Sequence, residues 1–186
     1  MGTLLKAALM NDLIAKHPMN NVRYTKPVRA KSDIKFLTRE EQRIFLDQAK
    51  RSHNYNQYAL ILETGLRTGE LIGLTWDAID FKNRTLTVNK TLEYRHNQKY
   101  WRAGPPKTPE SYRTIPLTSR AYDILKEIWD NRKNIKRSPL LLKTLEYIDR
   151  RTGATSRLVM ENLVFINWRT GEPEKNSSYD THLYKL

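Results

Sequence analysis

The sequence has no cysteine in its 186 residues. Disulfide bonds, thiolate catalysis and cysteine-ligated zinc are therefore excluded. No stretch approaches 18 consecutive apolar residues, so the sequence predicts neither a transmembrane helix nor a membrane partner. A secretory signal pattern is also missing, and together with the lack of disulfides this favours a reducing, cytoplasmic compartment.

The short motifs of several enzyme classes are absent as well. There is no G-x-x-x-x-G-K-[ST] phosphate-binding loop and no G-x-S-x-G nucleophile elbow. The histidines form no H-x-x-x-H pair, which favours surface or packing roles over metal ligation; they are His17, His53, His96 and His182. The sequence therefore predicts no metal site and no bound cofactor.

Positive charge is the most prominent feature of the composition. Lys and Arg number 33 against 20 Asp and Glu, a net charge of +13. Residues 1–35 have seven basic and two acidic side chains, and residues 82–113 have eight and two, interleaved with aromatic residues. Such clusters are typical of surfaces that follow a nucleic-acid backbone, and a basic solvated surface without a polyanionic partner is the simpler alternative. We expect contacts with duplex DNA from Lys26, Arg29, Lys31, Lys90, Arg102 and Arg113.

The hydrophobic pattern divides the chain into three parts. Apolar positions recur at helical spacing over residues 3–16 and stop before Pro18, which predicts that residues 1–17 are the tail helix of a preceding domain. Residues 18–35 are basic with little apolar pattern, so we expect an interdomain linker there. Residues 36–186 have enough apolar side chains for one folded domain.

Apolar periodicity and capping residues predict the helices of the third part. Thr38 and Glu41 have the spacing of a capping box, and Gly65 has the position of a helix-ending residue. We expect one helix after Thr38, a second at residues 55–64 and a third at residues 70–74 with Thr68 as its N-cap. A fourth begins at Thr118 or Ser119, and a fifth spans residues 179–186.

Alternating apolar residues predict a small sheet. Leu86 and Val88 indicate one strand and residues 113–117 another, with Pro116 marking a sheet edge. The expected fold is mostly α-helical with a three-stranded antiparallel sheet. The remaining expectations are a basic hairpin at residues 102–111, a strand at residues 164–168 and irregular structure at residues 131–158.

One segment is poorly explained by helix building alone. Arg67 stands between Gly65 and Gly69, at the break between two apolar helices. A guanidinium held on such a scaffold suits bidentate binding of a phosphate, and Glu70 is near enough in sequence to hold it by a charge-assisted hydrogen bond. A surface cation with a helix-start partner is the alternative interpretation of the same spacing.

Two carboxylates allow a different function. Asp77 and Asp80 are conceivable as metal-binding residues of a nuclease, whose cleavage EDTA would abolish. Their i, i+3 spacing beside a turn is more typical of capping and turn residues. The nuclease remains an alternative without an assigned metal.

The stretch T-G-L-R-T-G-E-L-I-G-L at residues 64–74 resembles the first conserved box of the tyrosine recombinases, which include phage and conjugative-transposon integrases. Residues 36–41 (FLTREE) resemble the opening of that family's catalytic domain, and residues 107–117 (KTPESYRTIPL) resemble its lysine hairpin. Residues 17–22 (HPMNNV) resemble the exit from its core-binding domain. The resemblance implies that the three parts of the chain are a core-binding tail, a linker and a partial catalytic domain.

The resemblance also implies roles for three residues. Arg67 matches the arginine that binds the scissile phosphate, Lys107 matches the proposed proton donor to the leaving 5′ oxygen, and Glu70 matches the acidic residue supporting the arginine. In this family a tyrosine attacks the DNA phosphodiester, forms a 3′-phosphotyrosyl link and frees a 5′-hydroxyl. Protomers then exchange strands in a synaptic complex, without a metal ion or nucleotide cofactor. We thus expect integration of a mobile element at the bacterial nucleoid.

The family's second box does not occur in this sequence. There is no His-x-x-Arg motif, and none of the ten tyrosines follows one. We therefore expect a C-terminally incomplete catalytic domain that binds DNA but lacks the nucleophile. A non-catalytic DNA-binding module or recombination regulator is the alternative, and a His-x-x-Arg motif in the coding sequence beyond Leu186 would decide against it.

Overall fold

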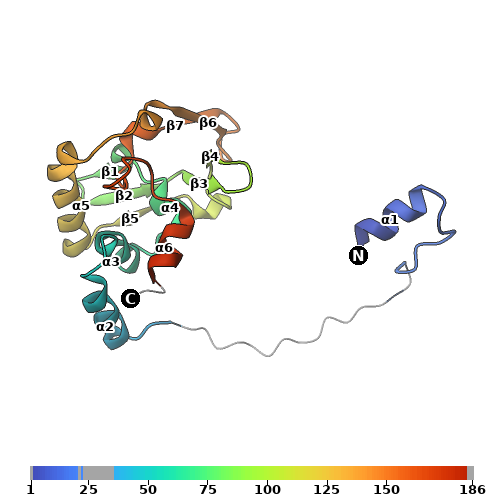
Figure 1. Cartoon of the computed structure of the whole chain (residues 1–186), viewed down its shortest axis with the longest axis horizontal. Helices are drawn as coiled ribbons and strands as arrows, with labels where there is room; N and C mark the ends of the chain where they lie inside the picture. Colours follow the sequence, from blue (N-terminus) through green and yellow to red (C-terminus); the bar gives the residue numbers. More distant parts are fainter. Residues whose placement is uncertain (1, 21, 23–35, 184–186) are drawn as a thin grey trace. The chain divides into compact units, whose positions relative to one another are not determined.

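The computed structural model describes residues 2–20, residue 22 and residues 36–183. The chain forms two compact units, Met1–Phe36 and Leu37–Leu186 (Figure 1). Most of the predicted linker lies outside the described residues, including the predicted DNA contacts Lys26, Arg29 and Lys31. Within the described ranges, no helix is long and apolar enough to cross a membrane.

The first unit contains helix α1 (Gly2–Met10), which ends six residues before the end of the apolar pattern. A Schellman motif closes it, in which the Leu13 N–H donates to the Ala8 carbonyl at 2.9 Å. Asp12 supplies the left-handed residue of this motif, with a φ of 54°, a conformation that aspartate tolerates better than most residues. Local capping therefore ends the helix well before Pro18.

The helices of the second unit begin and end largely at the predicted capping residues. They are α2 (Arg39–Ala49), α3 (Tyr55–Thr64), α4 (Thr68–Ile72), α5 (Ser119–Asn131) and α6 (Asn176–Leu183). Thr38 Oγ1 accepts from the Glu41 N–H at 3.2 Å and Glu41 Oε2 accepts from the Thr38 N–H at 2.7 Å, which confirms the capping box. Gly65 ends α3 in the left-handed conformation, with a φ of 64°. Helix α6 starts three residues earlier than predicted.

The strands form small antiparallel sheets. They are β1 (Ile79–Asp80), β2 (Thr85–Val88), β3 (Thr91–Arg95), β4 (Tyr100–Gly104), β5 (Arg113–Pro116), β6 (Thr144–Ile148) and β7 (Thr155–Val159). The predicted three-stranded sheet is present, with β2 between β1 and β5 and Thr85 opposite Pro116. Leu117 donates its N–H inward to the Arg84 carbonyl at 2.8 Å, so its neighbour Pro116 faces the outer side of an edge strand.

Two further hairpins make the domain less dominantly helical than the sequence predicts. Strand β3 pairs with β4, so the hairpin expected at residues 102–111 begins inside a strand. Strand β6 pairs with β7 and packs against β4, within the segment predicted to be irregular. Leu145 and Tyr147 alternate with polar residues ahead of Gly153, a period-2 signal that the many basic residues of this segment obscure.

Residues 164–168 are predicted as a strand, but they form only one isolated bridge. Ile166 forms an isolated bridge with Pro173, Leu163 just before the run forms another with Thr75, and the Val164 N–H donates to the Leu74 carbonyl at 2.9 Å. Val164 and Phe165 are buried. The apolar character of this segment therefore reflects its burial in the core and not membership of a strand.

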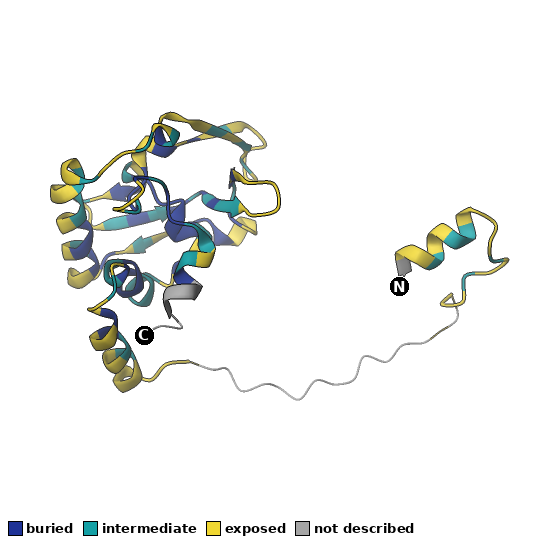
Figure 2. Cartoon of the chain, in the orientation of Figure 1, coloured by how far each residue is buried: buried dark blue, intermediate teal, exposed yellow. Residues whose placement is uncertain are grey.

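The core of the second unit lies between the helices and the three-stranded sheet (Figure 2). Its fully buried members include Leu60, Leu71, Ile72, Leu86 and Leu125. Helix α4 approaches β3 so closely that a Cβ on Gly73 would lie 2.7 Å from the Leu92 backbone nitrogen. Only glycine fits this contact, which fixes α4 and the connection before it.

Candidate active site

Arg67 lies in the short connection between α3 and α4. Leu66, just before it, is buried, and Arg67 itself occupies the N-cap position of α4. Thr68, the predicted N-cap, is instead the first residue of the helix. The Arg67 side chain is 61% exposed, so its guanidinium is accessible from solvent.

Glu70 bonds both the backbone and the side chain of Arg67. Its Oε2 accepts from the Arg67 N–H at 3.0 Å, and its Oε1 accepts from Arg67 Nη1 at 2.9 Å. The Glu70 side chain is only 2% exposed. The charge-assisted hydrogen bond expected from the spacing is thus present, and it joins a buried carboxylate to an exposed cation.

Arg113, from β5, bonds the same carboxylate. Its Nη2 donates to Glu70 Oε2 at 2.9 Å and its Nη1 donates to Glu70 Oε1 at 3.3 Å. It also donates to the Ser111 carbonyl at 3.1 Å and to the Gly65 carbonyl at 3.4 Å. The sequence predicts Arg113 as a DNA contact, and the structure shows its donors largely used by these protein acceptors. Its link to Glu70 is missed, because 43 residues separate the two.

These ion pairs set the protonation state of Glu70. Burial alone would raise the pKa of its carboxyl, but hydrogen bonds from Arg113 and Arg67 outweigh burial, and the pKa lies below its ordinary value. Glu70 is therefore an anion at neutral pH between two guanidinium groups. The surplus positive charge of this cluster lies on its solvent side, because Arg67 is its most exposed member.

The exposed side of the cluster lines a shallow surface pocket. Arg67 Nη1 approaches Ser111 Oγ at 3.4 Å, and Ser111 Oγ lies 3.1 Å from Thr108 Oγ1. Lys107 is exposed in the bend just before Thr108. No hydrogen bond between described residues joins Lys107 to the cluster. Its neighbour Thr108 lines the pocket, whereas Lys107 itself does not. The pocket is lined by Gly65, Arg67, Thr108, Glu110, Ser111 and Arg113.

Lys90 does not have the surface position that its predicted DNA contact requires. Its side chain is 8% exposed, and Nζ donates to Thr75 Oγ1 at 2.8 Å and to Asp77 Oδ2 at 2.9 Å. An ammonium enclosed in this way is unavailable to a phosphate. Arg102 does have an exposed position on β4, with a long ion pair of 3.7 Å to Glu93.

Asp77 and Asp80, the two carboxylates of the nuclease alternative, bond other groups of the protein. Asp77 pairs with Lys90, and Asp80 Oδ1 accepts from the Asn83 N–H at 2.9 Å. Asp80 Oδ2 accepts from Asn83 Nδ2 at 2.6 Å. These are turn and ion-pair contacts of the kind that the spacing favours. Across the described ranges, no three His, Asp or Glu side chains gather into a group that could hold a metal ion.

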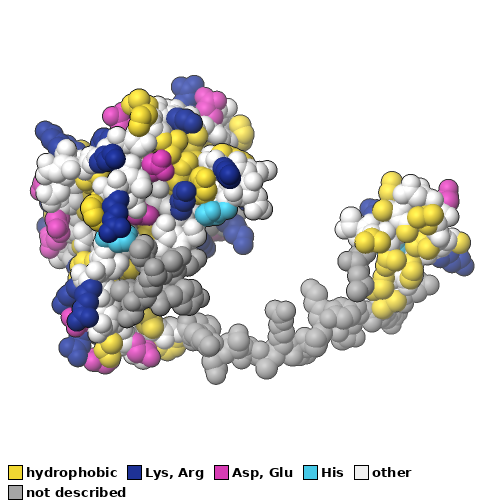
Figure 3. Space-filling model, in the orientation of Figure 1, with side chains coloured by type: hydrophobic (Ala, Val, Ile, Leu, Met, Phe, Trp, Pro, Cys, Tyr) yellow, Lys and Arg dark blue, Asp and Glu magenta, His cyan; other side chains and the backbone are white. Residues whose placement is uncertain are grey.

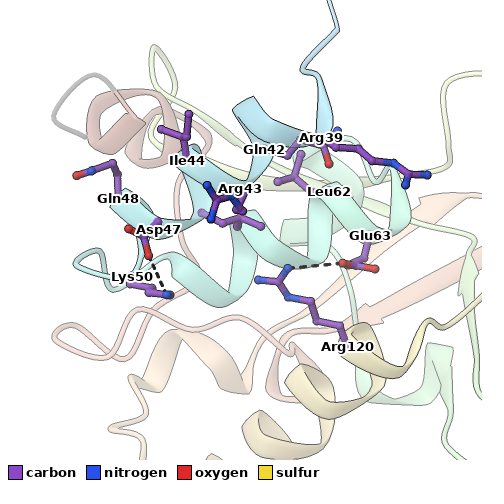
Figure 4. Close-up of a pocket in the computed structure, with 11 residues that line it drawn as sticks. Arg39, Gln42, Arg43, Ile44, Asp47, Gln48, Lys50, Leu62, Glu63 and Arg120 are labelled. Atoms are coloured by element: carbon purple, nitrogen blue, oxygen red, sulfur yellow. Dashed lines mark hydrogen bonds and ion pairs between the residues drawn. The ribbon is translucent and has the colours of Figure 1, made fainter.

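A larger surface pocket lies away from Arg67, between α2, α3 and α5 (Figure 4). Two ion pairs lie in its wall, Lys50 with Asp47 at 2.9 Å and Arg120 with Glu63 at 3.9 Å, and Arg39 and Arg43 also line it. In Figure 3, Lys and Arg side chains are spread over the visible face of the second unit among acidic ones. The pocket at Arg67 differs in that its two arginines share one buried carboxylate, that of Glu70.

Tyr179 is the last tyrosine whose surroundings the structure describes. It is 5% exposed, and its ring meets that of Tyr58 edge-on with centroids 6.4 Å apart. Its hydroxyl has no hydrogen-bond partner among the described residues, and burial raises its pKa above the ordinary tyrosine value. Tyr179 is therefore a packing residue in this structure.

Comparison with known proteins places this geometry in a family. The chain matches the phage integrase family over residues 35–179. It is 36% identical over 105 residues to the transposase from transposon Tn916 of Enterococcus faecalis. This match covers 54% of the present chain and 26% of the relative. It is 29% identical over 138 residues to a XerC-like tyrosine recombinase of Caldanaerobacter subterraneus subsp. tengcongensis, and this match covers 68% of the present chain and 35% of the relative. The matched part spans about a quarter to a third of these relatives.

Solved structures share the fold. The Tn1549 transposon integrase in complex with circular intermediate DNA superposes with a TM-score of 0.65 at 23% identity, over 98% of this chain and 54% of that chain. The XerA recombinase superposes with a TM-score of 0.50 at 13% identity, over 81% and 41%. The family match covers most of the chain and the fold agrees with it, so the chain belongs to the phage integrase family of tyrosine recombinases.

Proposed function

We propose that this chain is part of a site-specific recombinase that integrates a mobile DNA element through a 3′-phosphotyrosyl intermediate. The observation that carries the proposal is the exposed guanidinium of Arg67, held by the buried carboxylate of Glu70 in a chain of this family. The Tn1549 integrase binds a circular intermediate DNA, which supports duplex DNA as the substrate here.

Arg67 binds the scissile phosphate in this proposal. Glu70 and Ser111 accept from its Nη1, and no acceptor among the described residues bonds Nη2 or Nε, which can therefore donate to a ligand. A planar guanidinium offers parallel N–H groups to two phosphate oxygens. Because charge builds on the equatorial oxygens as phosphorus becomes pentacoordinate, this interaction is stronger in the transition state than in the ground state.

Lys107 is our candidate for the proton donor. Attack of a tyrosine oxygen on phosphorus forms one P–O bond and breaks the bond to the 5′ oxygen, which leaves as a hydroxyl once it takes a proton. Lys107 is exposed in the bend beside Thr108, whose side chain lines the pocket at Arg67. Bound DNA would bring the leaving oxygen to this side of the pocket.

The partners that we propose are duplex DNA and further protomers of the same recombinase in a synaptic complex. Sequence-independent phosphate contacts come from Arg102 and from three residues outside the described ranges, Lys26, Arg29 and Lys31. Lys90 is left out because it is buried. The free energy of the broken phosphodiester is conserved in the phosphotyrosyl link, so the reaction needs no nucleotide cofactor.

Substitution of Arg67 in a full-length recombinase carrying this sequence tests the proposal. Cleavage of a nicked suicide duplex, which traps the covalent adduct, should fall by about 10²- to 10³-fold in Arg67→Ala and in Arg67→Lys. DNA affinity should change by less than about threefold, since one phosphate contact among many is lost. Arg43→Ala is the control, because Arg43 is exposed and pairs only locally with Glu40. Near-normal cleavage by Arg67→Lys would remove Arg67 from the site.

Salt dependence tests the DNA partner with the 186-residue chain itself. If roughly 6–10 phosphates are contacted, affinity for duplex DNA should fall by about 10³- to 10⁵-fold between 50 and 200 mM salt. A flat response would contradict DNA as the partner. DNA binding by the full-length protein without any covalent adduct would instead favour a non-catalytic DNA-binding module or a recombination regulator.

A further inference from the structure

Tyr112 stands between two residues that contact the candidate active site. Ser111, before it, accepts a hydrogen bond from Arg67, and Arg113, after it, bonds Glu70. Tyr112 itself is buried, with 9% of its surface exposed. Its own contacts are with a distant part of the chain, the turn between β6 and β7 (Figure 1).

Three consecutive residues of that turn hold Tyr112. Its hydroxyl donates to Asp149 Oδ2 at 2.8 Å and accepts from the Arg150 N–H at 3.0 Å. The guanidinium of Arg151 lies over the ring, 4.6 Å from the centroid, and Nη2 of Arg151 donates to the Tyr112 carbonyl at 3.5 Å. Both ends of the tyrosine, hydroxyl and backbone, are therefore fixed by the same turn.

The turn has internal contacts that do not involve Tyr112. Asp149 Oδ1 accepts from the N–H groups of Arg151 and Thr152, each at 2.9 Å. Gly153 donates its N–H to the Asp149 carbonyl at 2.9 Å and has the left-handed φ of 69° that closes the hairpin. Hydrogen bonds from Thr152 and Tyr112 keep the pKa of Asp149 below its ordinary value, so it is an anion at neutral pH. The hairpin thus offers a preformed surface to Tyr112.

We propose that the β6–β7 hairpin is a positioning element for the active-site arginine, acting through Tyr112. By fixing Tyr112, the hairpin fixes Ser111 and Arg113 on either side of it. Ser111 then orients Arg67 directly, and Arg113 orients it through Glu70. Tyr112 and Asp149 are positioning residues, with no contact to the reacting phosphate. The catalytic consequence rests on the proposed function, whereas the orientation of Arg67 does not.

The need for such an element follows from the exposure of Arg67. A long side chain that is 61% exposed samples many rotamers unless its acceptors are themselves fixed. Ser111 Oγ lies on a short connecting segment, Pro109–Ser111, rather than on a long helix or strand. Contacts from the neighbouring residue, Tyr112, are therefore the means by which the hairpin holds this acceptor in place.

The first experiment measures the side-chain order of Arg67 by NMR in the 186-residue chain. Tyr112→Phe removes the hydroxyl and keeps the ring, and the order parameter of the Arg67 Nε–Hε bond should fall by about 0.2 or more. Asp149→Ala should give the same result. Tyr55→Phe is the matched control, because it removes a hydroxyl that bonds Arg120 elsewhere. An unchanged Arg67 signal in Tyr112→Phe, or an equal fall in Tyr55→Phe, would overturn the proposal.

The second experiment measures cleavage by a full-length recombinase carrying this sequence. Tyr112→Phe should slow cleavage about 10-fold at unchanged DNA affinity, since small misplacements of a catalytic group are costly. In the Arg67→Lys background it should cause no further loss, because both changes act on the same group. Additive losses would show that the hairpin acts independently of Arg67 and would overturn the proposal. A protein that cleaves no DNA would contradict the proposed function and leave the NMR result to decide the positioning role.

Discussion

Two ion-pair networks follow each other along the chain around α4, and they bury opposite partners. In the first, the carboxylate of Glu70 is 2% exposed and its cations lie outside it, with Arg67 61% exposed. In the second, the ammonium of Lys90 is 8% exposed and its partner Asp77 is 57% exposed. The buried partner decides which charge the surface presents. An anionic ligand is therefore attracted to the first network and not to the second.

Both arrangements satisfy the same physical requirement. A buried charge needs an opposite charge and enough hydrogen bonds to replace water. Glu70 receives both from two arginines, and Lys90 receives both from Asp77 and Thr75. Partial burial would raise the pKa of the Asp77 carboxyl, but hydrogen bonds from Thr75 and Lys90 lower it below the ordinary value. Sequence charge alone cannot distinguish the two networks.

Removing the buried carboxylate should have the largest effect on stability. Glu70→Gln leaves Arg113 and Arg67 without their anion, and the free energy of unfolding should fall by about 3 kcal/mol in urea titrations at pH 7. Asp47→Asn is the control, because Asp47 forms an exposed pair with Lys50 and should lose less than about 0.5 kcal/mol. Equal losses in the two variants would mean that burial of Glu70 contributes nothing.

Removing the exposed carboxylate of the second network should have a smaller effect. Asp77→Asn leaves the buried Lys90 ammonium with only the Thr75 hydroxyl and an uncharged amide, and we expect a loss of about 2 kcal/mol in the same titration. A loss larger than that of Glu70→Gln would reverse the comparison between the networks.

Replacing the buried cation by an apolar side chain should change stability least. The free energy of unfolding of Lys90→Met should lie within about 1 kcal/mol of that of the unchanged protein, because good apolar packing often stabilises a fold as much as a buried ion pair does. The salt dependence of DNA binding should also stay the same, whereas Arg102→Ala should lower its slope by about one. A lowered slope in Lys90→Met would return Lys90 to the DNA surface.

The pH dependence of stability sharpens the assignment of Glu70. Its pKa is lowered in the folded state, so its stabilising contribution is fully present above the ordinary carboxyl pKa of about 4.3 and is lost as pH falls through the folded pKa. The difference in unfolding free energy between the unchanged protein and Glu70→Gln should therefore be constant from pH 7 to 5. It should shrink at lower pH, and a difference that grows on acidification would contradict the assignment.

Local rules predict much of this fold. The Thr38–Glu41 capping box, the helix ended by Gly65 and the Arg67–Glu70 bond each depend on residues a few positions apart, and all three are present. The edge position of Pro116 also follows from a local property, its missing N–H. Capping and turn chemistry act at this range, so a single sequence contains the information.

The long-range contacts could not be predicted in the same way. Arg113 bonds Glu70 across 43 positions, and Lys90 bonds Asp77 across 13, so their classification as surface cations rested on charge alone. Ser111 contacts Arg67 across 44 positions, and no local pattern in the sequence links these two residues.

The strand that carries Arg113 also lies at an open edge of its sheet. Such edges can template pairing with another chain, and β1, at the opposite edge, has only two residues to offer. Along β5, Pro116 faces outward and has no N–H to donate to an incoming strand. The sheet is therefore a poor template for edge-to-edge association, and Arg113, which helps to hold Glu70 and Arg67, is kept out of β-pairing between molecules when the protein is concentrated.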